Sequence, residues 1–196
     1  MNYLSVENIS KSYGERVLFD NVSFGINKDQ KIAFIAKNGS GKTTIMNMIN
    51  GLDEPDSGQV VIRKEINMAF LSQNNNLQDE LTIEENIFAS DNEILKVIER
   101  YEKALENPND EEAYQRAFDD MDRHNAWDFE TQFKQILFKL KLEDLKMKVK
   151  NMSGGQKKRL SLAIILISKP DLLILDEPTN HLDLEMIEWL EDYFAK

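Results

Sequence analysis

The segment around Gly39 constrains the fold of this chain more than any other. An apolar run from Lys31 to Ala36 leads into Asn38-Gly39-Ser40-Gly41, and helix-forming residues follow from about Lys42 to Asn50, with Gly51 as the expected C-cap. A strand, a glycine-rich turn and a helix in this order form the first part of a βα unit, in which the strand lies in a parallel sheet. We therefore expect an α/β fold.

The turn has the composition of a phosphate-binding loop, apart from Ala36 at the position of its first glycine. Backbone N–H groups and the positive end of the helix dipole are suited to phosphate oxygens, although an ordinary glycine-rich turn is the alternative. Lys42 is expected to reach the β- and γ-phosphates, and the Thr43 hydroxyl to ligate Mg²⁺. An alanine with a positive φ lowers the free energy of unfolding by about 1–2 kcal/mol, whereas an alanine in an extended conformation costs little. We expect the extended conformation at Ala36. The expected contacts are Ala36, Lys37, Asn38, Gly39, Ser40, Gly41, Lys42, Thr43 and Thr44.

Two further segments carry candidate chemistry. The apolar run Leu172–Leu175 reads as a buried strand that ends in Asp176 and Glu177. Paired carboxylates there suit a Mg²⁺ ion held by Asp176 through water and a general base at Glu177, whereas a solvated strand end is the alternative. Ser153-Gly154-Gly155-Gln156 opens a later helix and forms either a second anion site or a simple N-cap.

Periodicity and turn residues outline the rest of the chain. Short strands are predicted at Leu4–Val6, Val17–Phe19, Val22–Ile26, Val60–Arg63 and Ile66–Leu71. Ser90 and Glu93 suggest a capping box before a helix marked by Ile94, Ile98, Tyr101 and Leu105. Further helices are marked by Tyr114, Phe118 and Met121, by Phe129 to Leu140, by Gln156 to about Ser168, and by Leu184 to Phe194. The helix marked by Ile94 to Leu105 and the helix marked by Tyr114 to Met121 are expected to form a helical hairpin with acidic outer faces.

Composition limits the function classes. The chain has no cysteine, which excludes disulfides and thiolate metal sites. No apolar run approaches the roughly 18 residues of a membrane span, and the first residues do not form a signal peptide, so we expect a cytoplasmic protein. The net charge of −11 disfavours nucleic-acid binding by the whole surface. The segment Lys134–Arg159 is an exception, with 9 bases and 2 acids.

The three motifs, in this order, resemble the ATP-binding cassette (ABC) superfamily over essentially the whole chain. The resemblance implies a P-loop NTPase nucleotide-binding domain with an antiparallel β subdomain near the N-terminus and a helical subdomain at about residues 74–169. ATP and Mg²⁺ are the implied cofactors, and ATP hydrolysis is the implied activity. Two such cassettes pair in the family, and each nucleotide lies between one phosphate loop and the partner's Ser153–Gln156 segment, where Met152 here replaces the usual Leu.

The resemblance also assigns roles to single residues. Tyr13 would stack on adenine, although it could be a strand-edge aromatic only. Gln73 would sense Mg²⁺ and the attacking water, which its sequence context alone would not suggest. Asp183 belongs to the loop that crosses to the partner cassette. Because Lys42, Asp176 and Glu177 are all present, a purely structural domain with an inactive nucleotide site is disfavoured.

The run Asp176–Asp183 resembles the ABC-F branch, whose members act on ribosomes rather than in membranes. The helical hairpin at residues 91–125, followed by Ala126-Trp127-Asp128, resembles the arm of that branch. Ribosomal RNA and ribosomal proteins are then the expected partners, with the segment Lys134–Arg159 favoured for RNA contact. The rival reading is the ATPase subunit of a membrane transporter.

The chain matches only part of one cassette, without the family's downstream histidine. We expect it to bind ATP weakly and to hydrolyse it slowly or not at all without a partner. We also expect the last helix to expose an apolar face made of Trp189, Leu190, Tyr193 and Phe194.

Overall fold

The computed structural model of this chain describes residues 1–37, 39–72, 77–89, 93–107, 109–180 and 182–195. It divides into two compact units, which are described separately below. The first unit comprises Met1–Ser72 and Pro170–Asp176, and the second comprises Gln73–Lys169 and Glu177–Lys196. No helix among the described residues is both long and apolar enough to cross a bilayer.

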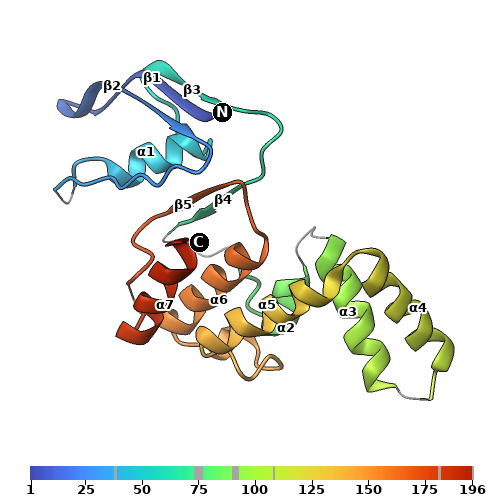
Figure 1. The fold of residues 1–196 in the computed structure, drawn as a ribbon. Helices are drawn as coiled ribbons and strands as arrows, with labels where there is room; N and C mark the ends of the chain where they lie inside the picture. The colour runs from blue at the N-terminus through green and yellow to red at the C-terminus, as the bar shows by residue number, and fades with distance from the viewer. Residues whose placement is uncertain (38, 73–76, 90–92, 108, 181, 196) are drawn as a thin grey trace. The chain divides into compact units, whose positions relative to one another are not determined.

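The first unit contains an antiparallel sheet with the strand order β2-β1-β3 (Figure 1). Strand β1 (Asn2–Tyr13) pairs with β2 (Arg16–Asn27) on one side and with β3 (Ser57–Ile62) on the other. The two strands expected at Val17–Phe19 and Val22–Ile26 are therefore one. Pairing with β1 continues through several register shifts, so the turn-forming residues between them kink the strand without ending it.

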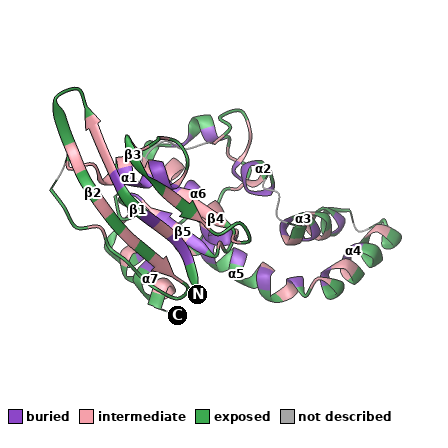
Figure 2. Ribbon diagram, turned by 90° about the horizontal axis from the view of Figure 1, so that it is seen from above, coloured by how far each residue is buried: buried purple, intermediate pink, exposed green. Residues whose placement is uncertain are grey.

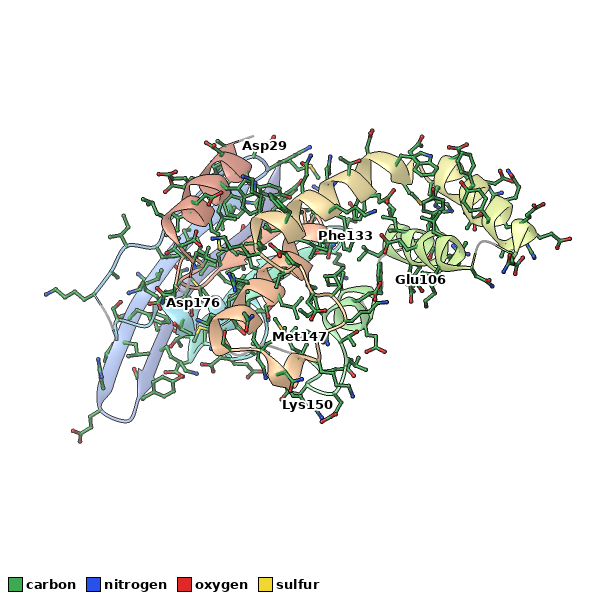
Figure 3. All side chains as sticks on the ribbon, turned by 90° about the horizontal axis from the view of Figure 1, so that it is seen from below. Asp29, Glu106, Phe133, Met147, Lys150 and Asp176 are labelled. Atoms are coloured by element: carbon green, nitrogen blue, oxygen red, sulfur yellow. The ribbon has the colours of Figure 1, made fainter. Side chains whose placement is uncertain are left out.

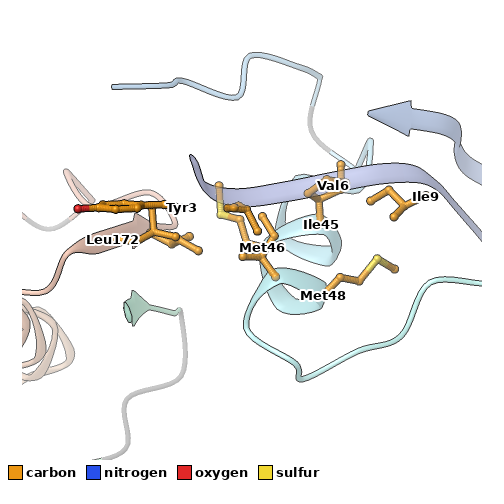
Figure 4. Packing of buried hydrophobic residues seen from close by; sticks show 10 residues of the cluster. Tyr3, Val6, Ile9, Ile45, Met46, Met48 and Leu172 are labelled. Atoms are coloured by element: carbon orange, nitrogen blue, oxygen red, sulfur yellow. The ribbon is translucent and has the colours of Figure 1, made fainter. Parts of the chain in front are cut away.

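A parallel pair, β4 (Met68–Leu71) and β5 (Leu172–Leu175), completes the strands described in this unit. Helix α1 (Lys42–Ile49) packs with β1 and β5 around a shared apolar core (Figure 4). Gly51 follows α1 with a φ of 70°, as expected for a glycine that ends a helix. The core residues are Tyr3, Leu4, Val6, Ile9, Ile45, Met46, Met48, Ile49, Leu172 and Ile174.

The prediction of a strand at Lys31–Ala36 is wrong, because this segment forms no strand in the structure. Its Ile35 side chain is 94% exposed, and only Phe34 packs inward, with its ring centroid 5.1 Å from that of Phe24. An extended segment becomes a strand when the edge of a neighbouring strand takes up its N–H and C=O groups. Among the described residues, β4 and β5 pair only with each other, so apolar composition alone does not make this segment a strand.

The second unit is helical. It contains α2 (Ile83–Phe88), α3 (Glu93–Glu106), α4 (Glu111–Arg123), α5 (Ala126–Lys139), the 3₁₀ turn η1 (Val149–Asn151), α6 (Gly154–Ile167) and α7 (Leu184–Ala195). Sequence reasoning missed α2, whose six residues are too few to show a helical period. Its signal was a capping box, in which Thr82 and Glu85 bond to each other's backbone N–H groups. Of the capping box predicted at Ser90 and Glu93, Ser90 lies outside the described residues, and Glu93 is the first residue of α3.

Helices α3 and α4 lie side by side and present their buried residues to each other and to α5 (Figures 1 and 2). An aromatic cluster joins the three helices. The Trp127 ring of α5 lies 5.1 Å from Tyr101 of α3 and 5.1 Å from Phe118 of α4, measured between centroids. Tyr114 lies 6.0 Å from Tyr101. The cluster fixes the hairpin on α5, because edge-to-face aromatic pairs add to the free energy of burial.

The expectation of an exposed apolar face on α7 is wrong. Leu190 is 3% exposed, and Trp189, Tyr193 and Phe194 are half-buried. The Tyr193 hydroxyl lies 3.5 Å from the Leu166 carbonyl of α6, and burial raises the pKa of Tyr193. These side chains are thus partly covered within the second unit, where Tyr193 lies against α6.

Candidate nucleotide site

Glycine is required at position 41, where α1 begins. Its φ is 94°, which disfavours any other residue, and a Cβ there would lie 2.9 Å from Cδ1 of Phe19. Gly41 is the N-cap of α1 and supplies no side-chain cap, and no acid lies in the first turn of the helix. The N–H groups and positive dipole end of α1 therefore remain available for an anion, as the glycine-rich motif predicted.

The side chain of Lys42 is held over its own loop. Its Nζ donates to the carbonyl oxygens of Ala36 at 2.7 Å and Lys37 at 3.2 Å. The backbone at Ala36 does not have a positive φ, so alanine carries no left-handed strain at this position. Arg16, the first residue of β2, donates through Nη2 to the carbonyl of Gly39 at 3.0 Å. Sequence reasoning missed Arg16, because no local spacing links a residue of β2 to this loop.

The hydroxyl of Ser40 is an orphaned polar atom inside the loop. Its Oγ is buried, and it has no hydrogen-bond partner in the part of the chain that the structure describes. Leaving a buried hydroxyl unpaired costs about 1–3 kcal/mol of folding free energy. A donor in this position suits an incoming acceptor such as a phosphate oxygen.

The hydroxyl of Thr43 donates to Oδ2 of Asp176 at 2.9 Å. Asp176 is 5% exposed, and its backbone N–H donates to the Leu71 carbonyl at 3.0 Å, which extends the β4–β5 pairing by one bond. The two side chains expected to serve a Mg²⁺ ion, 133 residues apart in sequence, therefore touch. This contact brings together the phosphate loop and the acid that follows β5.

The chemistry of this pair fits a Mg²⁺ ion that arrives with a nucleotide. Thr43 and Asp176 offer oxygen ligands, which Mg²⁺ prefers. Among the described residues, no group of three or more His, Asp or Glu side chains converges. A Mg²⁺ ion with two protein oxygen ligands would fill its remaining positions with phosphate oxygens and water.

Tyr13 lies at the end of β1 with its side chain tethered. Its hydroxyl donates to Oδ2 of Asp53 at 3.0 Å, and Nζ of Lys11 lies 5.5 Å from the ring centroid. The hydrogen bond to Asp53 raises the pKa of Tyr13, and the hydrogen bond from Lys11 lowers the pKa of Asp53. Tyr13 as a whole residue remains 55% exposed, so a base can reach it. Asp53 gave no sequence signal of its own.

Ser153 and Gln156 form a capping box at the start of α6. The Gln156 N–H donates to Oγ of Ser153 at 3.2 Å, and the Ser153 N–H donates to Oε1 of Gln156 at 2.8 Å. These are the bonds of the N-cap reading that the sequence left open. Gly154 has open space at its Cβ position, and the role of the segment toward a partner's nucleotide stays a prediction.

Glu177 and Asp183 lie in the loop between β5 and α7 and belong to the second unit. Oε2 of Glu177 accepts a hydrogen bond from Nδ2 of Asn180 at 2.7 Å. Asp183 caps α7 through Oδ1 and pairs through Oδ2 with Nζ of Lys141 at 2.6 Å. The predicted site residues Asn38 and Gln73 lie outside the described residues.

Six of the nine basic side chains of the segment Lys134–Arg159 pair with acids of the same unit. Lys150 lies in the turn before α6 (Figure 3). It pairs with Glu80 at 2.9 Å, and Lys157 pairs with Asp79 at 2.6 Å. Its charge is therefore less available to RNA than its composition suggests. The other pairs are Lys134 with Glu130 and Glu102, Lys139 with Glu185, Lys141 with Asp183, and Lys146 with Glu106.

Comparison with known proteins places the chain in a family. The profile described as ABC transporter matches residues 19–180. The chain belongs to this ABC family. Domains of this family are ATPase domains that bind ATP, generally with Mg²⁺, and they work as pairs of cassettes.

Relatives of the ABC cassette include members of the ABC-F branch. The chain is 41% identical to the ABC transporter ATP-binding protein YfmR of Bacillus subtilis, with 100% of the chain and 32% of that protein covered. It is 32% identical to the energy-dependent translational throttle protein EttA of Mycobacterium tuberculosis (97% and 35% covered). It is 39% identical to ABC transporter F family member 2 of Arabidopsis thaliana (97% and 30%). The chain thus spans about a third of the length of these relatives.

Solved structures support the fold assignment. An ATP-binding subunit of an ABC transporter matches with a TM-score of 0.68 at 23% identity, over 98% of this chain and 75% of that one. A nucleotide-free ATP-binding cassette from an ABC transporter matches with a TM-score of 0.60 at 24% identity, over 100% and 78%. The expected α/β fold with an antiparallel β part and helices is confirmed.

Proposed function

We propose that this ABC cassette binds and hydrolyses Mg-ATP and belongs to an ABC-F protein that acts on the ribosome. The observation that carries the nucleotide chemistry is the 2.9 Å hydrogen bond between Thr43 and Asp176, which joins the phosphate loop to the acid after β5. The ribosomal part is supported by the similarity to EttA, a protein named for translation, and to an F family member.

Each site residue has a proposed task. The N–H groups of Gly39 to Thr44 and the Lys42 ammonium bind phosphate oxygens, and Tyr13 offers its exposed ring to adenine. Thr43 and Asp176 hold Mg²⁺, with Gln73 beside it. Glu177 accepts the proton of the attacking water. The bound Mg-ATP supplies the phosphoryl group and the charge-neutralising cation.

The remaining assignments concern partners. A second cassette is proposed to lie against Ser153–Gln156 and Asp183, so that ATP binding closes the pair and hydrolysis opens it. Residues 74–169 form the helical subdomain, and residues 91–125 form the arm. The site of action is then the cytoplasm, and ribosomal RNA and proteins are the partners.

The test uses the full-length protein with Glu177→Gln and the same change in its second cassette, which should retain ATP without hydrolysing it. The variant is sedimented through sucrose with purified ribosomes, with Mg-ATP and without nucleotide. We expect ribosome pelleting that depends on ATP. Lys42→Ala in the same background is the control, because it removes the phosphate contact and should abolish pelleting.

A different result would separate the two parts of the proposal. ATP retention without ribosome pelleting, and recovery of the protein with membranes, would overturn the ribosomal role and favour a transporter subunit. Failure of the variant to retain ATP would overturn the nucleotide chemistry itself.

A further inference from the structure

The loop between β5 and α7 carries a hydrogen-bond network of its own. Nδ2 of Asn180 donates to Oε2 of Glu177 at 2.7 Å, and the Asn180 N–H donates to the Glu177 carbonyl at 3.2 Å. The Leu182 N–H then donates to the Thr179 carbonyl at 3.1 Å. Glu177 and Asn180 are thus joined twice, once through the backbone and once through their side chains.

The backbone of Glu177 is held in an unfavourable conformation. Its φ is 51°, in the left-handed region that a residue with a Cβ rarely adopts. Such a conformation persists only where surrounding contacts hold it, and residues of this kind concentrate at functional sites. The charge-assisted bond from Asn180 is a contact of that type.

The far end of the loop is also fixed. Both carboxylate oxygens of Asp183 are occupied, Oδ1 by the Met186 N–H at 3.0 Å and Oδ2 by Nζ of Lys141 at 2.6 Å. The bond from Lys141 lowers the pKa of Asp183, as expected for a carboxylate held in its charged form. The loop is therefore anchored to the start of α7 and to Lys141, which follows α5, and its internal bonds determine how the Glu177 carboxylate is oriented.

We propose that Asn180 is a positioning residue that fixes the direction of the Glu177 carboxylate. The amide N–H group occupies Oε2, and within the described part of the chain no hydrogen bond reaches Oε1. Oε1 is then the oxygen that faces the attacking water. This inference rests on the proposed function, in which Glu177 is the general base. Asparagine suits the task because an amide donates to a carboxylate without competing for its proton.

The first test measures the contact between Asn180 and Glu177 in the absence of nucleotide. Hydrogen exchange of the backbone is compared among the wild-type protein, Asn180→Ala, Asn180→Asp and the control Asn109→Ala, which alters an exposed asparagine elsewhere in the same unit. We expect the backbone amides at position 180 and at Leu182 to exchange roughly tenfold faster in both Asn180 variants. A change of this size is the effect of losing one charge-assisted hydrogen bond. Unchanged exchange in both variants would overturn the proposal.

The second test measures the rate of ATP hydrolysis by the full-length protein. Asn180→Ala should lower kcat for ATP roughly tenfold or more and leave KM and the thermal unfolding midpoint unchanged, because a misdirected base affects the chemical step and not binding. Asn180→Asp should lower kcat further, since its carboxylate repels that of Glu177. In the Glu177→Gln background, Asn180→Ala should have no additional effect.

The outcomes separate this inference from the proposed function. A wild-type protein that hydrolyses ATP, with Asn180→Ala equally active, would overturn the positioning role alone. Equal losses in kcat, ATP affinity and stability would also overturn it, because they indicate a structural role. A wild-type protein without turnover would overturn the proposed function, while hydrogen exchange would still show whether Asn180 holds Glu177.

Discussion

At the scale of single residues, both the backbone conformation and the packing against Phe19 favour glycine at position 41. Gly41→Ala should lower the free energy of unfolding by about 2–3 kcal/mol, because it adds left-handed strain and a methyl group that contacts the Phe19 ring. The measurement is urea unfolding at equilibrium. Gly51→Ala is the matched control, since Gly51 has a φ of 70° but no atom within 4 Å of its Cβ position.

We expect Gly51→Ala to cost about 1 kcal/mol, from strain alone. The difference between the two variants then measures the contact with Phe19. Equal losses would show that the Phe19 ring moves aside at no cost. Gly154→Ala, with an ordinary φ and open space around it, should change stability by less than about 0.5 kcal/mol.

The ion pair between Lys141 and Asp183 makes stability depend on pH at both extremes. The hydrogen bond from Lys141 lowers the pKa of Asp183 below its ordinary value of 3.8, so this contribution is lost as the pH falls through the folded-state pKa. The hydrogen bond to Asp183 raises the pKa of Lys141 above 10.5, so that contribution is lost as the pH rises through the folded-state pKa. Between about pH 5 and pH 9 the pair stabilises fully.

Asp183→Asn isolates the charge, because asparagine still caps a helix. The urea midpoint of the wild type should exceed that of Asp183→Asn at neutral pH, and the gap should close toward both extremes. The effect is small, since both side chains are about half exposed and solvent screens them. A gap that stays constant with pH would rule out the ion pair as its cause.

At the residue scale, local motifs indicated where a helix begins, and the chemical roles of their residues stay predictions. Helix α1, which begins after Gly41, followed from the glycine-rich turn and the helix-forming residues after it, whereas the strand expected before the turn did not form. Arg16 and Asp53 could not be found in this way. Their roles depend on hydrogen bonds to residues 23 and 40 positions away, which no local spacing specifies.

At the scale of elements, helices followed from the sequence better than strands. Most apolar residues that marked α3, α4 and α5 are buried, among them Ile98, Met121 and Phe133, so local pattern and tertiary structure agree there. Leu105 and Tyr114 are exceptions, because both are exposed. A strand depends on a neighbour, and the apolar segment at Lys31–Ala36 has none among the described residues. Helix α2 was missed because it is short and is recognised only by its cap.

Trp127 should determine whether the α3–α4 hairpin stays folded against α5. Trp127→Ala removes the ring contacts with Tyr101 and Phe118 and the 2.7 Å bond from Nε1 to Asp122. We expect a loss of about 2–3 kcal/mol in unfolding free energy. Backbone hydrogen exchange should rise in α3 and α4 more than in α6.

Trp127→Phe is the control that keeps an aromatic ring and removes the N–H donor. Its loss should be about 1 kcal/mol, the usual net value of one hydrogen bond. Wild-type stability in both variants would contradict a structural role for the cluster.

At the scale of the whole molecule, charge limits how the chain can meet RNA. If the segment Lys134–Arg159 contacts ribosomal RNA, changing Lys146, Lys148 and Lys150 to Glu should weaken ribosome binding of the full-length protein at least tenfold at low salt. Lys146 and Lys150 already pair with Glu106 and Glu80, so binding must exchange these partners and should fall steeply as salt rises.

The matched control changes Lys28, Lys31 and Lys64, three exposed lysines of the first unit, to Glu, so that the net charge falls by the same amount. Pelleting with ribosomes over a series of salt concentrations measures both variants. Unchanged binding in the first variant would exclude the segment as an RNA contact. Equal weakening in both would attribute the effect to net charge.

The sequence by itself determined the local chemistry of this protein: a glycine-rich loop before a helix, an apolar strand before two acids, and amphipathic helices with a hairpin between them. These follow from dihedral preferences and from the burial of apolar faces, which act over a few residues. Only the tertiary structure decided that Thr43 touches Asp176, that Asn180 bonds to Glu177, and that most lysines of the basic segment pair with nearby acids. Such contacts depend on the distances that packing sets between residues, and composition does not encode those distances locally.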